Sequence, residues 1–176
     1  MKITIIRDCS EFLKQSNGKP LVKFLPKEGP DQRKIKVRKR KTDSKFDKVF
    51  NTVFSQHPDL RQRAVFCSGA SGLRAEDAEA DLEPFYVFPP DGFKYIYSPN
   101  VYRSSIQYQD TLDRFLDVMG ENAAIETFKE VLKYDYIGSN LIDGIGQGCE
   151  IIVYNVPYFF AIRTSSVNKY STLFSL

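Results

Sequence analysis

The pattern of hydrophobic and polar positions along the chain predicts short strands interleaved with amphipathic helices. The clearest helix follows Asp43 or Ser44, and both residue types are good helix caps. Its apolar residues recur at the spacing of one helical face and are Phe46, Val49, Phe50, Val53 and Phe54. Further helices are expected over 106–118 and 121–134. A short helix capped by Asp8 or Ser10 would bury Phe12 and Leu13.

Short apolar or alternating runs predict the strands. They are expected over 2–6, 21–25, the first half of 33–41, 64–68, 85–88, 93–97, 150–154 and 158–163. Small and acidic residues over 69–83 indicate a solvated turn or a short helix. The glycines over 138–148 indicate a mobile or tightly turned segment. Because the chain has no internal repeat and no low-complexity linker, we expect one α+β domain over residues 1–176.

Composition narrows the class of protein. Of the 176 residues, 42% are hydrophobic and 27% are charged, which is typical of a folded globular domain. The chain contains no run of about 18 apolar residues, so neither a membrane span nor a membrane partner is expected. Arg7, Asp8 and Glu11 interrupt the N-terminal segment and make it a poor signal peptide. These features predict a cytoplasmic protein.

Two residue types limit the chemistry. Cys9, Cys67 and Cys149 form no CxxC motif and cannot all pair, so we expect free thiols that pack in a reducing compartment. His57 is the only histidine, and its sequence QHPDL indicates a turn at a helix end. A Ser-His-Asp or Cys-His hydrolase, or most zinc sites, would depend on this one residue. We therefore expect no histidine-dependent nucleophile and no metal site.

Charge is divided unevenly along the chain. Residues 1–50 hold 15 Lys and Arg against 6 Asp and Glu, whereas residues 51–176 hold 10 against 16. Much of the excess lies in the segment 33–41, RKIKVRKRK. Its basic residues are Arg33, Lys34, Lys36, Arg38, Lys39, Arg40 and Lys41. The segment is either a solvated basic strand or a contact for nucleic acid or another anion. Phe and Tyr are plentiful enough to stack on bases.

Two polar residues at strand ends are candidates for chemistry. Glu150 begins a strongly apolar strand, where it either lies in water or is placed in a cleft to stabilise a developing positive charge. Ser68 ends a shorter strand, and either a hydrogen-bonding role or plain strand termination is expected for it. The glycine motif GIGQG precedes a strand, whereas a dinucleotide-binding loop follows one, so we exclude that match.

The order of these features resembles a known enzyme class. An arginine on an early strand, a serine on a middle strand and a glutamate on a late strand after a glycine-containing loop resemble the Arg-Ser-Glu class of ADP-ribosyltransferases. The segments VRKRKTDS, AVFCSGASGLRA, FYVFPPDGFKYIYSPNV and GQGCEIIVYNVPYFFAIR are most similar to compact bacteriophage members, over about residues 36–163. The resemblance implies a split mixed or antiparallel sheet with flanking helices, and NAD as a substrate.

The resemblance also implies roles for individual residues. Arg38 or Arg40 would grip the NAD pyrophosphate or the adjacent ribose, and Ser68 would support the nicotinamide pocket. Glu150 would bind the ribose 2′-hydroxyl and stabilise the oxocarbenium ion as nicotinamide leaves. Tyr95 or Tyr97 would stack on nicotinamide.

Two departures from the class concern the acceptor and the serine motif. Gly148 stands two positions before Glu150, where many such enzymes carry Glu or Gln to guide the acceptor. Either the acceptor differs from arginine, or transfer activity has been lost. The serine motif is Cys67-Ser68-Gly69 in place of Ser-Thr-Ser.

The functional prediction is a mono-ADP-ribosyltransferase that cleaves NAD and modifies a host protein or nucleic acid. The resemblance places it in the cytoplasm of the host cell or packaged in the virion, with a part in host takeover. The alternative is a non-catalytic phage protein of the same fold that binds nucleic acid or a host factor through residues 33–41. A catalytic protein would depend on Glu150, whereas the alternative would not.

Overall fold

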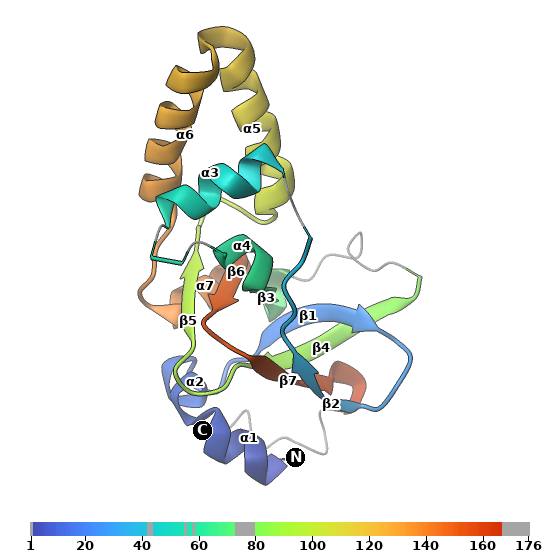
Figure 1. The fold of residues 1–176 in the computed structure, drawn as a ribbon. Coiled ribbons are helices and arrows are strands. Elements are labelled where there is room, and N and C mark those ends of the chain that lie inside the picture. The colour runs from blue at the N-terminus through green and yellow to red at the C-terminus, as the bar shows by residue number, and fades with distance from the viewer. Residues whose placement is uncertain (1, 42–43, 55, 58, 73–79, 167–176) are drawn as a thin grey trace.

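The computed structural model describes residues 2–41, 44–54, 56–57, 59–72 and 80–166 (Figure 1). The helices are α1 (Lys2–Asp8), α2 (Ser10–Gln15), α3 (Lys45–Val53), α4 (Leu60–Arg63), α5 (Ser104–Met119), α6 (Glu121–Asp135) and α7 (Leu141–Gln147). The strands are β1 (Leu21–Pro26), β2 (Gln32–Lys36), β3 (Val65–Gly69), β4 (Leu82–Phe88), β5 (Lys94–Tyr97), β6 (Glu150–Tyr154) and β7 (Tyr158–Arg163). A 3₁₀ turn, η1 (Ala70–Gly72), follows β3.

The strands form one seven-stranded sheet in the order β2-β7-β4-β1-β3-β6-β5. Every strand pairing in the described chain is antiparallel, so the fold is α+β with an open antiparallel sheet and no parallel component there. None of the helices in the described ranges is long and apolar enough to span a membrane.

The sheet is nearly divided between β1 and β3. These strands pair only at Leu21 with Gly69 and at Val22 with Ser68, whereas β1 and β4 pair along six positions. Beyond Val22 the two strands separate, and the sheet splits into a β2-β7-β4-β1 part and a β3-β6-β5 part. The two parts run in different directions in Figure 1. Residues of both strands, among them Lys23 of β1 and Ser68 of β3, line a cleft.

Two hydrophobic cores cover opposite faces of the β3-β6-β5 part. The side chains of Ile151 and Val153 on β6 pack in the core that includes α1, α2 and α7. Ile152, between them, packs in the core formed with α3, α4, α5 and α6. This alternation is the period of two expected of a strand buried on both faces. Figure 1 shows the α5–α6 hairpin extending away from the sheet beyond α3.

Most predicted elements are present. The helix expected after Asp43 or Ser44 is α3, with the Ser44 hydroxyl accepting a hydrogen bond from the main-chain N–H of Asp47 at 3.1 Å. Asp43 and most of the acidic stretch 69–83 lie outside the described residues. The main-chain N–H of His57 donates to the Phe54 carbonyl at 2.7 Å, which confirms the turn at a helix end.

Two predicted elements are wrong. Residues 2–6 form helix α1, because Ile5 and Cys9 are both buried in the core at helical spacing while Ile6 faces solvent. The glycine-rich stretch 138–148 contains helix α7, in which Leu141 and Ile145 are buried one turn apart. In both cases tertiary packing overrides a local preference for another conformation.

Helix α7 packs closely against β3 at Gly69, and this contact provides a test of the fold. A Cβ at Gly69 would collide with the main-chain carbonyl of Ile145, whereas a Cβ at Gly146 in the same helix would meet nothing within 4 Å. We expect Gly69→Ala to lower the free energy of unfolding by about 1–3 kcal/mol, the usual cost of overpacking. Urea denaturation should show no such loss for the control Gly146→Ala, and equal losses would contradict the contact.

Candidate functional site

The cleft contains a carboxylate at the point where the sheet divides. Glu150 is the first residue of β6 and lies directly opposite Ser68 on β3 in the strand register. On the facing strand β1, Lys23 extends into the opening and donates from Nζ to the main-chain carbonyl of Phe66 at 3.0 Å. That carbonyl lies where β1 has already separated from β3, so the Lys23 ammonium replaces a strand partner.

Helix α5 begins at the Glu150 carboxylate. The hydroxyl and the main-chain N–H of Ser104, the first residue of α5, lie near the carboxylate and both act to lower its pKa. The first N–H groups of a helix have no partner within it, so a carboxylate there satisfies a free donor and meets the positive end of the helix dipole. In contrast, Oε1 of Glu150 is buried and has no hydrogen-bond partner among the described residues.

Burial and nearby cations act on the Glu150 carboxyl in opposite directions. Burial dominates and raises its pKa above the ordinary value, while the Ser104 hydrogen bonds, Arg61 and Lys23 act to lower the pKa. A buried carboxylate oxygen without a hydrogen-bond partner lowers the stability of the folded protein, so a group of this kind calls for an explanation such as a functional role. Such a group, in a cleft and with a perturbed pKa, is a candidate for catalysis.

A buried network of polar contacts, from Asp47 through Arg61 to Ser104, holds Ser104 in place. The Arg61 guanidinium donates from Nη1 to Ser104 Oγ at 2.6 Å and from Nε to Asp47 Oδ1 at 2.8 Å. The Arg61 and Asp47 side chains are only 7% and 10% exposed. Because Arg61 donates to the serine oxygen, the Ser104 hydroxyl proton is left for a second acceptor. This network therefore connects α3, α4 and α5 close to Glu150, the first residue of β6.

Two cavities meet at Glu150. The first has a volume of about 220 Å³ and is lined by residues that include Lys23, Ser68, Gly72 and Tyr102. The second has a volume of about 390 Å³ and is lined by Arg40, Arg61, Ser105 and Ile106. Phe66, Arg103 and Glu150 line both. We call these the Lys23 cavity and the Arg40 cavity, and Glu150 belongs to the wall of both.

The cations of the cleft lie close enough to repel one another. The guanidiniums of Arg40 and Arg61 lie against the same Phe66 ring, at 4.5 and 4.6 Å from its centroid. Burial and then Arg61 lower the pKa of Arg40, and burial together with Arg40 lowers the pKa of Lys23. Clustered like charges of this kind gain stability from a bound anion.

Arg38 and Arg40, the arginines predicted to bind NAD on a strand, lie in the loop that follows β2, which ends at Lys36. Arg40 borders the cleft, where Nη2 donates to the Arg61 carbonyl at 3.1 Å and its main-chain N–H donates to the Gln62 carbonyl at 3.0 Å. Arg38 is exposed and is not among the described residues lining either cavity. The basic side chain on an early strand beside the cleft is Lys23.

The tyrosines predicted to stack on nicotinamide lie on the wrong face of the sheet. Tyr95 and Tyr97 on β5 pack in the core with α7, opposite the face that carries Glu150. Side chains alternate between the two faces of a strand, so Tyr95 and Tyr97 share one face. Ile96, between them, lies on the other face and packs in the core formed with α3, α4, α5 and α6. The aromatic residue at the cleft is instead Tyr102, which precedes α5 and is 46% exposed.

The rest of the basic segment 33–41 divides into two parts. On β2, the Arg33 guanidinium donates to the carbonyls of Glu28 and Pro30, and the Lys34 ammonium lies 3.7 Å from the centroid of the Tyr158 ring. Lys36 is exposed on the same strand. After β2, Lys39 forms an ion pair with Asp59 at 3.0 Å, and Lys41 is exposed. Only the second part approaches the cleft.

Gly148, two positions before Glu150, has no room for a side chain. Its φ is +67°, and a Cβ there would lie 2.6 Å from the main-chain nitrogen of Gly72. Main chain therefore packs on main chain where η1 meets the end of α7. No side chain from position 148 can reach an acceptor.

Other reactive groups do not contribute to the cleft chemistry. All three cysteines are buried and unpaired, and burial raises the pKa of Cys9 and Cys67 to about 12 and that of Cys149 to about 11. These thiols stay protonated at neutral pH and are poor nucleophiles. His57 packs against Tyr154, with the ring centroids 4.6 Å apart and the ring planes tilted by 58°. The described part of the chain holds no group of three His, Cys, Asp or Glu placed to share a metal ion.

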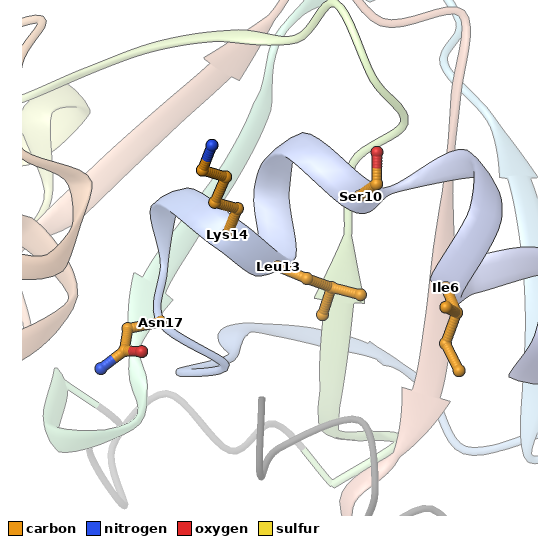
Figure 2. Close-up of a pocket in the computed structure, with 5 residues that line it drawn as sticks. All are labelled: Ile6, Ser10, Leu13, Lys14 and Asn17. Carbon is orange, nitrogen blue, oxygen red and sulfur yellow. The ribbon is translucent and has the colours of Figure 1, made fainter.

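A separate cavity lies on α1 and α2, and Figure 2 shows the residues that line it. Its volume is about 390 Å³, and its lining residues are Ile6, Ser10, Leu13, Lys14 and Asn17. The surface is mainly apolar, and Lys14 is the only ionisable group among these residues. This cavity has no acid–base pair and offers no evident catalytic chemistry.

Sequence reasoning missed Lys23, Arg61, Arg103 and Ser104. The Lys23 signal is one charged residue within the apolar run LVKFL, and Arg61 is one of two arginines in the short segment LRQR. The sequence YRSS immediately before the helix over 106–118 carries a stronger signal, because serines at a helix start are candidates for binding anions or capping.

No protein-family model, curated protein or solved structure matches this chain. What the protein does therefore has to follow from the geometry of the cleft.

Proposed function

We propose that the protein is an ADP-ribosyltransferase that cleaves NAD at the Glu150 cleft. The observation that carries this proposal is the junction of two cavities at one largely buried carboxylate, Glu150. A transfer reaction needs a donor space and an acceptor space that share the reacting centre. The resemblance of the chain to the Arg-Ser-Glu class supports the choice of NAD as donor.

The chemistry requires a fixed negative charge beside the donor ribose. The bond from ribose C1′ to the nicotinamide nitrogen breaks, and nicotinamide leaves with the bonding electrons as a neutral molecule. The positive charge left on the ribose is stabilised by the Glu150 carboxylate, which lines both cavities and would also accept a hydrogen bond from the 2′-hydroxyl. An acceptor oxygen or nitrogen then bonds to C1′ and releases its proton to water.

We assign the donor to the Lys23 cavity. Lys23 lies on β1, the strand next to β3, which carries Ser68. Its ammonium would bind the NAD pyrophosphate. Ser68, which is paired with Glu150 in the strand register, also lines this cavity. Tyr102 lines this cavity and supplies an aromatic ring at its rim.

Isothermal titration with NAD tests the donor site. A hydrogen bond from a charged group is worth about 1.5–3 kcal/mol, so Lys23→Met should weaken NAD binding by about 10- to 100-fold. Lys23→Arg should restore binding, because it keeps the charge and gains a fork for phosphate. The control is Arg38→Ala, since Arg38 is exposed and borders neither cavity in the described chain.

The outcomes separate the proposal from its alternative. Saturable NAD binding that Lys23→Met removes and Arg38→Ala preserves supports the transferase. A wild-type protein that neither binds nor cleaves NAD contradicts it and favours the non-catalytic binding protein. Circular dichroism and the thermal midpoint of each variant check that binding is not lost through unfolding.

A further inference from the structure

We propose that the outer edge of β2 binds an extended acidic segment of another protein, which adds to the sheet as a further antiparallel strand. Strand β2 stands first in the strand order β2-β7-β4-β1-β3-β6-β5, so its outer side has no strand partner within the described chain. Binding there needs neither the cleft nor NAD and is independent of the proposed function. The main-chain groups, the side chains and the charges of β2 each favour this kind of partner.

The main-chain groups of β2 alternate between β7 and the open edge. The main-chain N–H of Arg163 donates to the Asp31 carbonyl at 2.8 Å, and that of Val37 donates to the Pro157 carbonyl at 2.9 Å. In an antiparallel pair, the residues that bond to one neighbouring strand recur at every second position. The odd-numbered positions of β2 therefore bond to β7, and the even-numbered ones turn their N–H and C=O groups outward. The outward residues are Gln32, Lys34 and Lys36.

The basic side chains beside this edge lean inward over the sheet. The Arg33 guanidinium lies 4.4 Å from the centroid of the Phe85 ring, which belongs to β4, the strand beyond β7. On the opposite face, the Lys34 ammonium lies 3.7 Å from the centroid of the Tyr158 ring on β7. Neither side chain therefore covers the outward main-chain groups. Together they place positive charge on both faces of the sheet, next to an edge that an extended chain can reach.

The side chains of β2 also specify the pattern of the partner strand. Directly opposite residues of two paired strands share a face, and opposite charges stabilise such a pair. Lys34 and Lys36 are exposed on one face, so acidic residues are favoured opposite them. Ile35, between them, is half-buried against the core on the other face and favours an apolar residue. The best partner is therefore a strand in which acidic and apolar residues alternate.

A nucleic acid fits this edge less well than a peptide does. Its phosphates would meet the lysines, but it carries no regular alternation of N–H donors and C=O acceptors to pair with the outward groups of β2. An extended peptide has one donor and one acceptor at each residue and the same spacing as β2. The edge therefore favours an acidic strand over other anions.

NMR titration of the ¹⁵N-labelled protein with a synthetic peptide of alternating Val and Glu, about seven residues long, tests this binding. The main-chain amides of Gln32, Lys34 and Lys36 should shift and become protected from hydrogen exchange. The amides of Arg33 and Ile35 already bond to β7 and should change little. N-methylation of the peptide's glutamates removes the N–H groups that would face β2 and should abolish binding. This control uses the wild-type protein and does not depend on the folding of a variant.

A charge exchange tests the side-chain pairing. The variant Lys34→Glu/Lys36→Glu should bind the Val–Glu peptide about 10-fold more weakly, because two attractive cross-strand pairs become repulsive. The same variant should bind a peptide of alternating Val and Lys more tightly than the wild type does, which shows that the edge is still folded. The matched control is Lys94→Glu, because Lys94 is exposed on β5, the strand at the opposite edge of the sheet. It should leave the affinity unchanged.

Protection of the three outward amides that is lost on N-methylation, together with the exchanged preference of the double variant, supports strand addition at β2. An absence of shifts in these amides at about 1 mM peptide overturns it. Equal binding of the N-methylated peptide also overturns it, because charge alone would then explain the attraction. An equal loss of affinity in the Lys94→Glu variant, or equal protection of the same amides by a single-stranded oligonucleotide, does so as well.

Discussion

The Glu150→Gln variant should cleave NAD about 100- to 1000-fold more slowly than the wild type, which is the usual cost of losing one electrostatic contact to a transition state. The amide keeps the shape and a hydrogen-bonding oxygen at the start of β6 but carries no charge to stabilise the ribose cation. Release of nicotinamide, followed by chromatography, measures the rate. Glu126→Gln is the matched control, because Glu126 is exposed on α6 and forms an ion pair with Lys129 at 2.7 Å.

The same substitution should change the pH dependence of stability. Burial raises the pKa of Glu150 in the folded protein, so the folded state holds this proton more tightly than the unfolded state. The bound proton of Glu150 therefore adds to the free energy of unfolding. This contribution is complete below the ordinary glutamate pKa of about 4.3 and is lost as pH rises through the raised pKa. The amide of the Glu150→Gln variant cannot titrate, so this variant should unfold at an equal or higher temperature than the wild type at pH 8. NAD cleavage that persists in this variant contradicts the assigned role of Glu150.

Arg61→Met should lower the free energy of unfolding by about 3–5 kcal/mol, which is typical when one partner of a buried ion pair is removed. The substitution leaves the Asp47 carboxylate buried without its cation and removes the donor to Ser104. It also removes a guanidinium that lies 4.7 Å from the Phe46 centroid and 4.6 Å from that of Phe66. Urea denaturation at neutral pH measures the loss.

A second variant distinguishes loss of charge balance from loss of packing. Asp47→Asn/Arg61→Met removes both charges and should recover part of the stability, because no uncompensated charge remains buried. If the double variant is as unstable as Arg61→Met alone, packing of the guanidinium against the phenylalanine rings is the main contribution. A loss below about 1 kcal/mol in the single variant, the range of an exposed ion pair, contradicts a buried pair.

Strand positions could be predicted wherever apolar runs were short and bounded by turns. Residues 150–154 and 158–163 are strands as expected, and the ends that carry Ser68 and Glu150 were correctly placed. Their direct pairing across β3 and β6 is a long-range property of the sheet. No local pattern specifies it, because register depends on which strands become neighbours.

The rest of the site comes from segments that are distant in sequence. Lys23 is one charge in an apolar strand, and it becomes a cleft residue only because β1 separates from β3 after Val22. Arg61 and Ser104 meet because α4 and the start of α5 pack together over Glu150. Tyr95 and Tyr97 were placed wrongly because the sequence shows that they share a face but not which face.

Strand β2 lies at the edge of the sheet, and there the first half of the basic segment 33–41 has a role apart from ligand binding. An edge strand presents unpaired main-chain N–H and C=O groups to any extended chain that approaches it. Here that strand carries Arg33, Lys34 and Lys36, and an identical strand from a second molecule would bring the same charges against them. Mutual repulsion therefore opposes growth of the sheet from one molecule to the next, and it protects the open edge from aggregation.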